Sequence, residues 1–510
     1  MRHRSLKSLV RRATTLLLFA TFCFAFTACS QAEIRLPKIL GSHMVLQRES
    51  EVKIWGWAQP GEKAFIYCDW LDVVYEVPTD SRGEWQVIVQ TSKAGGPHKI
   101  NITGSVSKNR IELTDILFGE VWIASGQSNM EMPVGHFSGT YSGVQDFKQE
   151  IAAAKHPEIR LFQVGNFSSK EPLDDVETGI SMYGIPVADC RWKACSPETI
   201  PAFASTAYFF ARKLHEELGV PIGIVDASWG GTKIESWMPA AGLQKHGRDA
   251  LLKHAATAPQ DPAQKVPTRL YNGMIHPLRQ MKIRGFIWYQ GEQNAAEADQ
   301  YAPLFATMID QWRSSFGHDY PFYFAQAAPC SRYQVNAALL REAQLKCMAR
   351  GGKDGVPKTG MPKTGMAVTL DIGDLDDVHP KNKQEIGRRL ALWALAKDYG
   401  RPIVPSGPVY REAKFENGRA RLAFDFATGG LATSDNNSPS HFEIAGEDQV
   451  FYPAKAVIDG KRLLVTSEKV AKPVAVRYSF TSAGGGNLIN KQGLPASSFR
   501  TDAWKIPLEP

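Results

Sequence analysis

Three stretches of the chain differ in the spacing of their apolar residues. From 33 to 112, short segments alternate apolar and polar residues between turns, as in Val52–Trp57 and Glu84–Val89. Alternation with a period of two predicts half-buried strands, so we expect an antiparallel β-domain resembling a small sandwich. Its tryptophans are expected to fill the core, whereas exposed ones would indicate a sugar-binding platform.

From 113 to 402, apolar runs alternate with stretches whose apolar residues recur every three or four positions, as in Phe203–Leu218 and Tyr301–Trp312. This recurrence predicts amphipathic helices between strands. The predicted strands are 117–124, 159–164, 222–227, 284–289, 320–326 and 366–371. Such an order predicts an α/β domain with a mostly parallel sheet covered on both faces, whose site lies beyond the carboxyl ends of the strands.

The segments outside this alternation predict loops and a further β-region. Residues 135–193 predict a long surface excursion that contains a helix over 144–155, and the Gly- and Pro-rich stretch 351–365 predicts a flexible loop. From 403 to 510 the helical spacing is absent, and short strands such as 409–422 predict a C-terminal β-region.

The first 28 residues predict a secretory signal peptide. Basic residues precede an apolar run of 16 residues, 13–28, which is shorter than the roughly 20 residues that span a membrane. Cys29 follows directly, which is typical of a bacterial lipoprotein whose first mature residue is that cysteine; an ordinary signal peptide cut nearby is the alternative. We therefore expect an exported protein of the periplasm or outer-membrane surface, held at the membrane only by a lipid on Cys29.

Charge and cysteine content exclude some functions. The net charge of +7 falls to +2 without the leader, leaving 54 basic and 52 acidic residues, so nothing indicates a nucleic-acid partner. After Cys29 an odd number of cysteines remains, without a C-x-x-C pair, which argues against structural zinc. A disulfide between Cys190 and Cys195, or between Cys330 and Cys347, stays open.

Polar motifs follow four of the predicted strands. The first is EVWIASGQSNMEMP over 120–133, where an apolar run breaks into a sharp turn that presents Ser128. Serine is a poor nucleophile unless a base takes its proton, so this interpretation requires a histidine, an orienting acid and oxyanion donors. A serine that merely caps a helix would give the same local pattern.

The second and third motifs supply candidate oxyanion donors. In ASWGGT over 227–232, paired glycines let the backbone approach a ligand, and the N–H of Gly231 would suit an oxyanion. In WYQGEQN over 288–294, the amide of Gln290 or Asn294 could donate to the same oxygen, while Glu292 is expected to anchor loops. Both motifs are also common as plain turns.

The fourth motif, DIGDLDDVHP over 371–380, supplies the base His379. A carboxylate three residues earlier can reach Nδ1 and leave Nε2 to deprotonate a serine, which selects Asp376, with Asp377 and Asp374 as competitors. These aspartates with Asp371 also suggest a metal site. The spacing lacks the calcium-loop pattern, however, so we expect no metal.

Six blocks resemble the sialate O-acetylesterase family, a branch of the SGNH (GDSL-like) hydrolases. They read GQSNMEMPV, SWGGTKIESWMP, LYNGMIHPL, WYQGEQN, DVHPKNKQEIGRRLA and GLPASSFRTDAW. The resemblance runs from about residue 33 to the C-terminus. It implies a flavodoxin-like α/β hydrolase domain flanked by β-domains, and removal of O-acetyl groups from sialic acid or a related glycan without metal or other cofactor.

The same resemblance implies roles for single residues. Ser128 matches the nucleophile, His379 the base, Gly231 the oxyanion glycine, and Gln290 with Asn294 the polar donors of the third block. The other functions considered are acetyl xylan or other plant-glycan esterase, glycan-binding lipoprotein with an inactive hydrolase core, metal-dependent hydrolase and lipase. No long apolar lid is evident for a lipase.

Overall fold

The computed structural model describes residues 33–139, 141–179, 188–258, 263–348 and 360–508. The chain divides into two compact units, one containing 55–87 and 100–112 with the residues up to 36, and the other containing 37–54, 88–99 and 113–510. The domain boundaries at 112/113 and 402/403 stay predictions. The predicted signal peptide, Cys29 and most of the predicted loop 351–365 lie outside the described residues.

The first unit is built from antiparallel strands, as its alternating sequence predicts. Strand β3 (Lys63–Cys68) pairs with β4 (Val74–Pro78) and with β6 (Gly95–Gly104). Strands β2 (Glu51–Trp57) and β5 (Glu84–Gln90) form a two-stranded sheet, and the side chains of β5 alternate between interior and solvent. Trp55 and Trp85 are buried, which confirms their predicted place in the core.

The second unit is organised around a mainly parallel sheet with the order β13-β12-β11-β7-β10-β8-β9. Its strands are β7 (Arg110–Gly126), β8 (His156–Gln163), β9 (Trp192–Cys195), β10 (Ile222–Ser228), β11 (Gly285–Tyr289), β12 (Phe322–Ala325) and β13 (Thr364–Ala367). Along this order β9 is antiparallel to β8 and the other neighbours are parallel, and β1 (Val45–Gln47) pairs parallel with β7. Five of the predicted strands are confirmed, the first of them within the longer β7, and the sixth is present with different bounds, which confirms the mixed α/β class.

The last predicted strand, 366–371, was placed too late in the chain. The strand is Thr364–Ala367, and the following residues bond to helix side chains instead: the Val368 carbonyl accepts from Arg389 at 2.7 Å. The apolar run therefore indicates that the segment is buried beneath a helix. It does not distinguish a strand from a buried loop, because both can be apolar.

Helices cover both faces of this sheet. They are α2 (Ser128–Glu131), α3 (Phe147–Ala153), α4 (Ser205–Leu218), α5 (Ala240–Lys245), α6 (Asp249–Thr257), α7 (Ala298–Ser315), α8 (Gln334–Cys347) and α9 (Lys383–Lys397). Short 3₁₀ turns are η1 (Ile234–Trp237), η2 (Ala263–Lys265), η4 (His276–Leu278), η5 (Glu292–Glu297) and η6 (Ser331–Tyr333), and η3 (Tyr271–Ile275) is a π-turn. Helix α3 begins later than predicted because the Val144 N–H bonds to the Val134 carbonyl.

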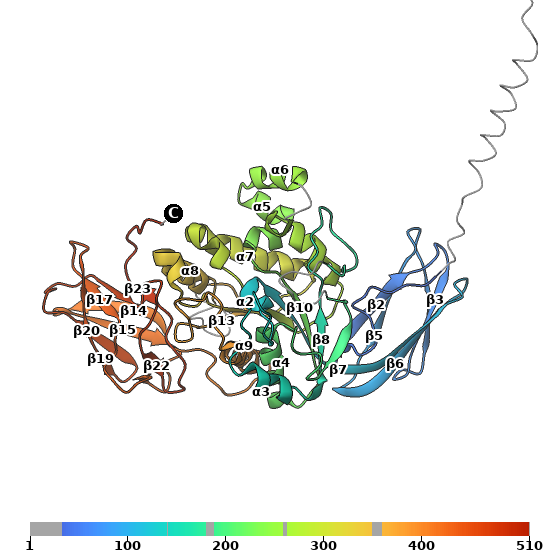
Figure 1. Ribbon diagram of the computed structural model, residues 1–510, viewed down its shortest axis with the longest axis horizontal. Helices are drawn as coiled ribbons and strands as arrows, with labels where there is room; N and C mark the ends of the chain where they lie inside the picture. Colours follow the sequence, from blue (N-terminus) through green and yellow to red (C-terminus); the bar gives the residue numbers. More distant parts are fainter. Residues whose placement is uncertain (1–32, 140, 180–187, 259–262, 349–359, 509–510) are drawn as a thin grey trace, which may run out of the picture. The chain divides into compact units, whose positions relative to one another are not determined.

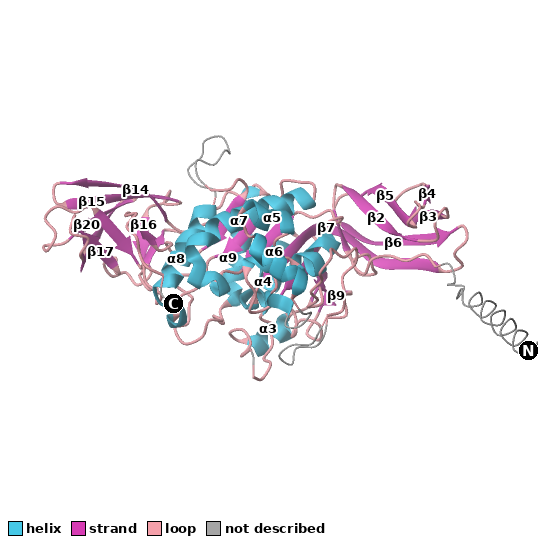
Figure 2. Cartoon of the chain, turned by 90° about the horizontal axis from the view of Figure 1, so that it is seen from above, coloured by secondary structure: helices cyan, strands magenta, loops and turns pink. Residues whose placement is uncertain are grey.

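Aromatic side chains fix which helix covers which face. Trp122 of β7 packs against Phe210 of α4 with ring centroids 5.0 Å apart, and Trp288 of β11 packs against Trp312 of α7 at 5.7 Å. Helices α4 and α9 lie together on one side of the sheet, and α7 and α8 lie together on the other (Figures 1 and 2). The predicted two-sided cover is confirmed.

The C-terminal part is all β. Its strands are β14 (Val409–Glu416), β15 (Arg419–Asp425), β16 (Leu431–Thr433), β17 (Phe442–Ala445), β18 (Phe451–Pro453), β19 (Lys455–Asp459), β20 (Arg462–Thr466), β21 (Ala475–Tyr478), β22 (Leu488–Asn490) and β23 (Phe499–Arg500). The single strand predicted over 409–422 is wrong. Asn417 and Gly418, with φ of 50° and 71°, turn the chain into a hairpin, the geometry that Asn-Gly favours.

The five cysteines of the described part of the chain, Cys68, Cys190, Cys195, Cys330 and Cys347, are free and buried, so neither suggested disulfide forms. Each is the small apolar side chain that free cysteine commonly is in a protein core. No helix within the described ranges has the length and apolar character needed to cross a bilayer.

Candidate active site

The turn after β7 places Ser128 at the carboxyl edge of the sheet. Gly126 has φ of 142°, and a Cβ there would lie 2.1 Å from the carbonyl oxygen of Tyr289 on β11. Glycine is therefore required for β7 to approach β11 this closely. The Gln127 N–H then donates to the same carbonyl at 3.0 Å, and Ser128, half-buried, begins α2. The predicted strand and sharp turn before the serine are present, and Ser128 opens a short helix whose N-cap residue is Gln127.

The second motif lies against this turn. A Cβ built on Gly230 would be 3.2 Å from the Cβ of Ser128, tighter than an ordinary contact, so only a residue without a side chain lets the second motif lie this close to the serine. Gly231 has φ of 70°, and a Cβ there would meet no atom within 4 Å. The side of the Gly231 backbone on which a side chain would project is therefore open, as a site that admits a reacting acyl group requires.

Glu131 ties α2 to the glycine turn. Its carboxylate accepts the Gly230 N–H at 2.7 Å, the Asn166 amide at 2.8 Å and the Tyr141 hydroxyl at 3.3 Å. Burial raises the pKa of Glu131 in spite of these bonds. The ring of Tyr141 meets the ring of His379 edge-on, with centroids 5.2 Å apart. One carboxylate therefore connects the serine helix, the glycine turn and the tyrosine beside the histidine.

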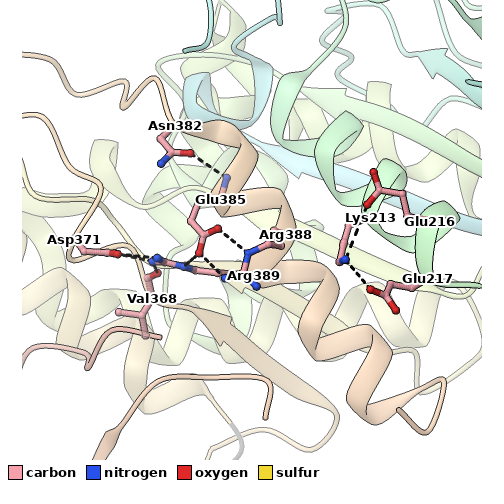
Figure 3. A network of polar contacts seen from close by, with 9 residues as sticks. All are labelled: Lys213, Glu216, Glu217, Val368, Asp371, Asn382, Glu385, Arg388 and Arg389. Atoms are coloured by element: carbon pink, nitrogen blue, oxygen red, sulfur yellow. Dashed lines mark hydrogen bonds and ion pairs between the residues drawn. The ribbon is translucent and has the colours of Figure 1, made fainter. Parts of the chain in front are cut away.

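The loop that carries His379 is tied to α9 at both ends (Figure 3). At its start, Arg389 donates to both oxygens of Asp371 at 2.6 and 2.7 Å. At its end, the Asn382 side chain accepts the Glu385 N–H at 3.1 Å and caps the helix. Because Asp371 forms an ion pair with Arg389, the aspartates 371, 374, 376 and 377 do not form one cluster. Within the described ranges no three His, Cys, Asp or Glu side chains gather as metal ligands.

Among the three candidate acids, Asp377 lies beside the imidazole. Its Oδ1 is 3.4 Å from Nδ1 of His379 and accepts the His379 N–H at 2.9 Å. Asp374 instead accepts the backbone N–H groups of Asp376 and Asp377 at 3.0 and 3.3 Å, and shapes the turn. The side chain of Asp376, which the three-residue spacing selects, is exposed.

The surroundings of His379 favour its neutral form. Burial first, and then the Lys383 cation, lower its pKa to about 4, and the Asp377 carboxylate only partly opposes them. Its Nε2 is buried and has no hydrogen-bond partner among the described residues. Near pH 7 the imidazole is therefore neutral, and Nε2 has a lone pair available for a proton.

The third motif lies deeper than expected. Gln290 is fully buried, and its Nε2 donates to the Thr232 carbonyl at 3.1 Å and to Asn294 Oδ1 at 2.8 Å. Its Oε1 accepts from the Tyr301 hydroxyl at 2.9 Å, and Asn294 donates onward to Glu235 at 3.0 Å. Both amide hydrogens of Gln290 are used inside the protein, so direct donation to an oxyanion does not fit this geometry. Gln290 and Asn294 instead hold the chain after the glycine turn.

Asn129, next to Ser128, joins the first, third and fourth motifs, which the sequence analysis did not identify. Its Nδ2 donates to Glu292 Oε1 at 2.6 Å and to the Val378 carbonyl at 3.0 Å, while its Oδ1 accepts from Lys383. The neighbour of Ser128 is thereby bonded to the neighbour of His379. The sequence indicates these contacts only in that Asn129 and Lys383 lie within the same blocks as Ser128 and His379.

The fold and the site define a carboxylic ester hydrolase built on an α/β sheet. The chain belongs to the carbohydrate esterase, sialic acid-specific acetylesterase family, whose model matches residues 119–391. It is a carbohydrate O-acetylesterase. The mouse sialate O-acetylesterase is 30% identical over 77% of this chain and 79% of its own length, and the human one is 28% identical over 72% and 71%. A crystal structure of a carbohydrate acetylesterase from Xanthomonas citri superposes with a TM-score of 0.80 at 37% identity, covering 92% of this chain and all of its own.

Proposed function

We propose that Ser128 is the nucleophile and His379 the general base of this esterase, with Asp377 rather than Asp376 orienting the base. The observation that carries the proposal is the 3.0 Å hydrogen bond from Asn129 to Val378, which brings together residues next to the two reactive groups. The neutral imidazole and the open backbone at Gly231 support it.

The reaction follows from these positions. Nε2 of His379 takes the proton of Ser128, whose Oγ attacks the acetyl carbonyl carbon. The backbone N–H groups of Ser128 and Gly231 stabilise the oxyanion of the tetrahedral intermediate. The imidazolium returns the proton to the sugar oxygen as the C–O bond breaks. Water then gives its proton to His379 and attacks the acetyl-enzyme, and acetate leaves as the serine is reprotonated.

The strand order supports the finer fold assignment, an SGNH domain of flavodoxin-like type. The run β10-β7-β11-β12-β13, which leaves out the parallel strand β8 beside β10 and the antiparallel edge strand β9, has the order 2-1-3-4-5 along the chain. That order is the flavodoxin-like one, and its site lies beside the first strand, where the strand order reverses. Ser128 follows that first strand.

The substrate class we propose is an O-acetylated glycan, with acetylated sialic acid first and acetyl xylan or another plant glycan second. The mouse and human relatives are named for sialate esters, whereas the Xanthomonas neighbour is named only for carbohydrate. An acetyl group requires little room, so the loops around the site rather than Ser128 itself would choose the sugar.

Acetate release from 9-O-acetyl sialic acid, acetylated xylan and an aryl acetate, measured side by side, tests the function. We expect Ser128→Ala to lower kcat by ~10³-fold or more on every substrate, and Ser138→Ala, at an exposed serine, to leave it unchanged. Wild-type turnover by Ser128→Ala would refute the nucleophile. Glycan binding by the wild type without any acetate release would instead favour a binding lipoprotein, and loss of activity on exhaustive chelation would favour a metal hydrolase.

We also propose that the protein is exported and anchored by a lipid on Cys29, since a basic, then apolar leader directly precedes that cysteine. Membrane fractionation of cells that express the full chain tests this. Cys29→Ser should move the protein from the membrane pellet to the soluble fraction. An unchanged pellet would refute the anchor.

A further inference from the structure

Beneath the Ser128 turn lies a cluster of three buried polar side chains, Asn129, Glu292 and Lys383. Asn129 comes from the first motif, Glu292 from the third and Lys383 from the start of α9, just after the fourth, and their exposed fractions are 0%, 3% and 0%. Burying a carboxylate and an ammonium group is costly unless both are compensated by hydrogen bonds or opposite charge. A cluster of this kind therefore requires an explanation.

Asn129 bridges the two charged groups, and chemistry fixes which way its amide points. Its NH₂ group faces two acceptors, Glu292 Oε1 at 2.6 Å and the Val378 carbonyl at 3.0 Å. Its carbonyl oxygen faces the Lys383 ammonium, which also lies 5.0 Å from the centroid of the Tyr289 ring. A flipped amide would place donor against donor and acceptor against acceptor, so the charges hold Asn129 in one orientation.

Stability of the fold alone does not account for this cluster. Buried charges replaced by apolar groups of similar volume often leave a protein equally or more stable. Here Glu292 retains a buried Oε2 without a hydrogen-bond partner among the described residues. Burial lowers the pKa of Lys383 to about 7, against the attraction of Glu292 and Asp377. Burial thus disfavours the charged forms of both side chains at the place where the serine turn and the histidine loop meet.

We propose that Asn129, Glu292 and Lys383 are positioning residues for deacetylation: Lys383 and Glu292 orient Asn129, and Asn129 holds the Val378–His379 backbone against the Ser128 turn. This inference rests on the proposed roles of Ser128 and His379. The three residues act through the reactive pair and do not contact the acetyl group.

Lys383 has a second effect, on the charge of His379. The groups that face this imidazole are Asp377 of its own loop, Lys383 of α9, Arg332 of η6 and the Tyr141 ring. Lys383 is the buried cation among them, whereas Arg332 is exposed and screened by solvent. Removal of the Lys383 charge is therefore expected to make His379 easier to protonate, which a purely structural role for Lys383 would not do.

The first test compares Lys383→Met with Lys381→Met, a neighbouring exposed lysine, in the full chain with an aryl acetate. We expect Lys383→Met to lower kcat by ~10- to 100-fold with KM changed less than about threefold. The acid limb of its kcat/KM profile should move to higher pH. If Lys383→Met matches Lys381→Met in both kcat and the acid limb, the proposal is overturned.

Two substitutions of Glu292 test the proposal independently if Lys383→Met does not fold. Glu292→Gln retains an oxygen that can accept from Asn129, whereas Glu292→Leu does not. We expect Glu292→Gln to keep most of kcat and Glu292→Leu to lose ~10-fold or more, with the same circular dichroism spectrum. Equal, wild-type kcat in both variants would overturn the proposal. Activity of Ser128→Ala, measured in parallel, separates this outcome from a failure of the nucleophile assignment.

Discussion

The carboxylate of Asp377 lies 3.4 Å from Nδ1 of His379, although Asp377 is two residues before the histidine and not the expected three. The backbone explains this closeness. Asp377 Oδ1 accepts the His379 N–H at 2.9 Å, which folds the side chain back over its own loop. Asp376, three residues before His379, would lie beside the imidazole only if this loop had a different backbone conformation.

The orienting acid is tested by two matched substitutions. We expect Asp377→Asn to lower kcat by ~10²- to 10⁴-fold, because the imidazole loses the group that fixes its tautomer and stabilises its charged form. Asp376→Asn should stay within about twofold of the wild type, since exposed charges contribute little. Both are measured by steady-state acetate release. The reverse ranking would restore Asp376 as the acid.

The pH dependence of activity follows from the lowered pKa of His379. In the proposed mechanism the neutral imidazole is the base, and its pKa of about 4 keeps it neutral well below the ordinary value near 6.5. We therefore expect kcat/KM to stay level from neutral pH down through 6.5 and to fall only as the pH approaches 4. An acid limb centred near 6.5 would contradict the buried environment of the base.

The same shift affects stability, with a definite sign. Between about 4 and 6.5 the unfolded chain binds a proton at His379 that the folded chain does not, so the free energy of unfolding decreases as the pH falls through this window. Urea unfolding at several pH values measures it. His379→Gln should show a weaker decrease than the wild type in this window, and an identical slope in both would contradict the assignment.

Gln290 is expected to contribute to the stability of the fold and not directly to the catalytic step. Gln290→Leu removes the hydrogen bonds to the Thr232 carbonyl, Asn294 Oδ1 and the Tyr301 hydroxyl. Asn294 Oδ1 still accepts the Ile234 N–H at 3.0 Å, and Tyr301 still donates to the backbone carbonyl of residue 290 at 3.0 Å. A lost hydrogen bond costs about 0.5–1.5 kcal/mol and a buried group left unpaired about 1–3 kcal/mol, so we expect the free energy of unfolding to drop by about 2–5 kcal/mol. Denaturant titration measures it. Wild-type stability with kcat lowered by more than 100-fold would instead return Gln290 to the role of oxyanion donor.

The two glycines beside Ser128 should respond differently to a methyl group. In Gly230→Ala the new Cβ meets Glu131 Oε2 at 2.7 Å and Ser128 Cβ at 3.2 Å, so the serine turn must move and kcat should fall by ~10-fold or more. Gly231→Ala meets open space but has a left-handed backbone, so it should lose about 1–2 kcal/mol of stability. Kinetics with thermal unfolding on both variants separates the effects. Unchanged kcat in Gly230→Ala would contradict the close approach to Ser128.

Much of the fold was accessible from local patterns. Burial within one segment is visible in the apolar runs around Trp122 and Trp288 and in the three- to four-residue spacing of α4 and α7. These patterns predict strands, helices and a sheet covered on both faces without reference to the rest of the chain. The C-terminal hairpin was missed although Asn417-Gly418 is a strong local turn signal. Apolar residues recur on both sides of this turn, so their spacing alone predicts one continuous strand.

The sequence by itself determined the α/β sheet, the order of its motifs and the family to which they belong, because strand and helix periodicity and short blocks are local properties. Only the tertiary structure decided that Asp377 rather than Asp376 lies beside His379, that Gln290 is buried, and that Lys383 lies under Ser128. Asn129 and Lys383 are 254 residues apart in sequence. Whether a charged side chain is buried depends on which distant segments pack over it, and no local pattern carries that information.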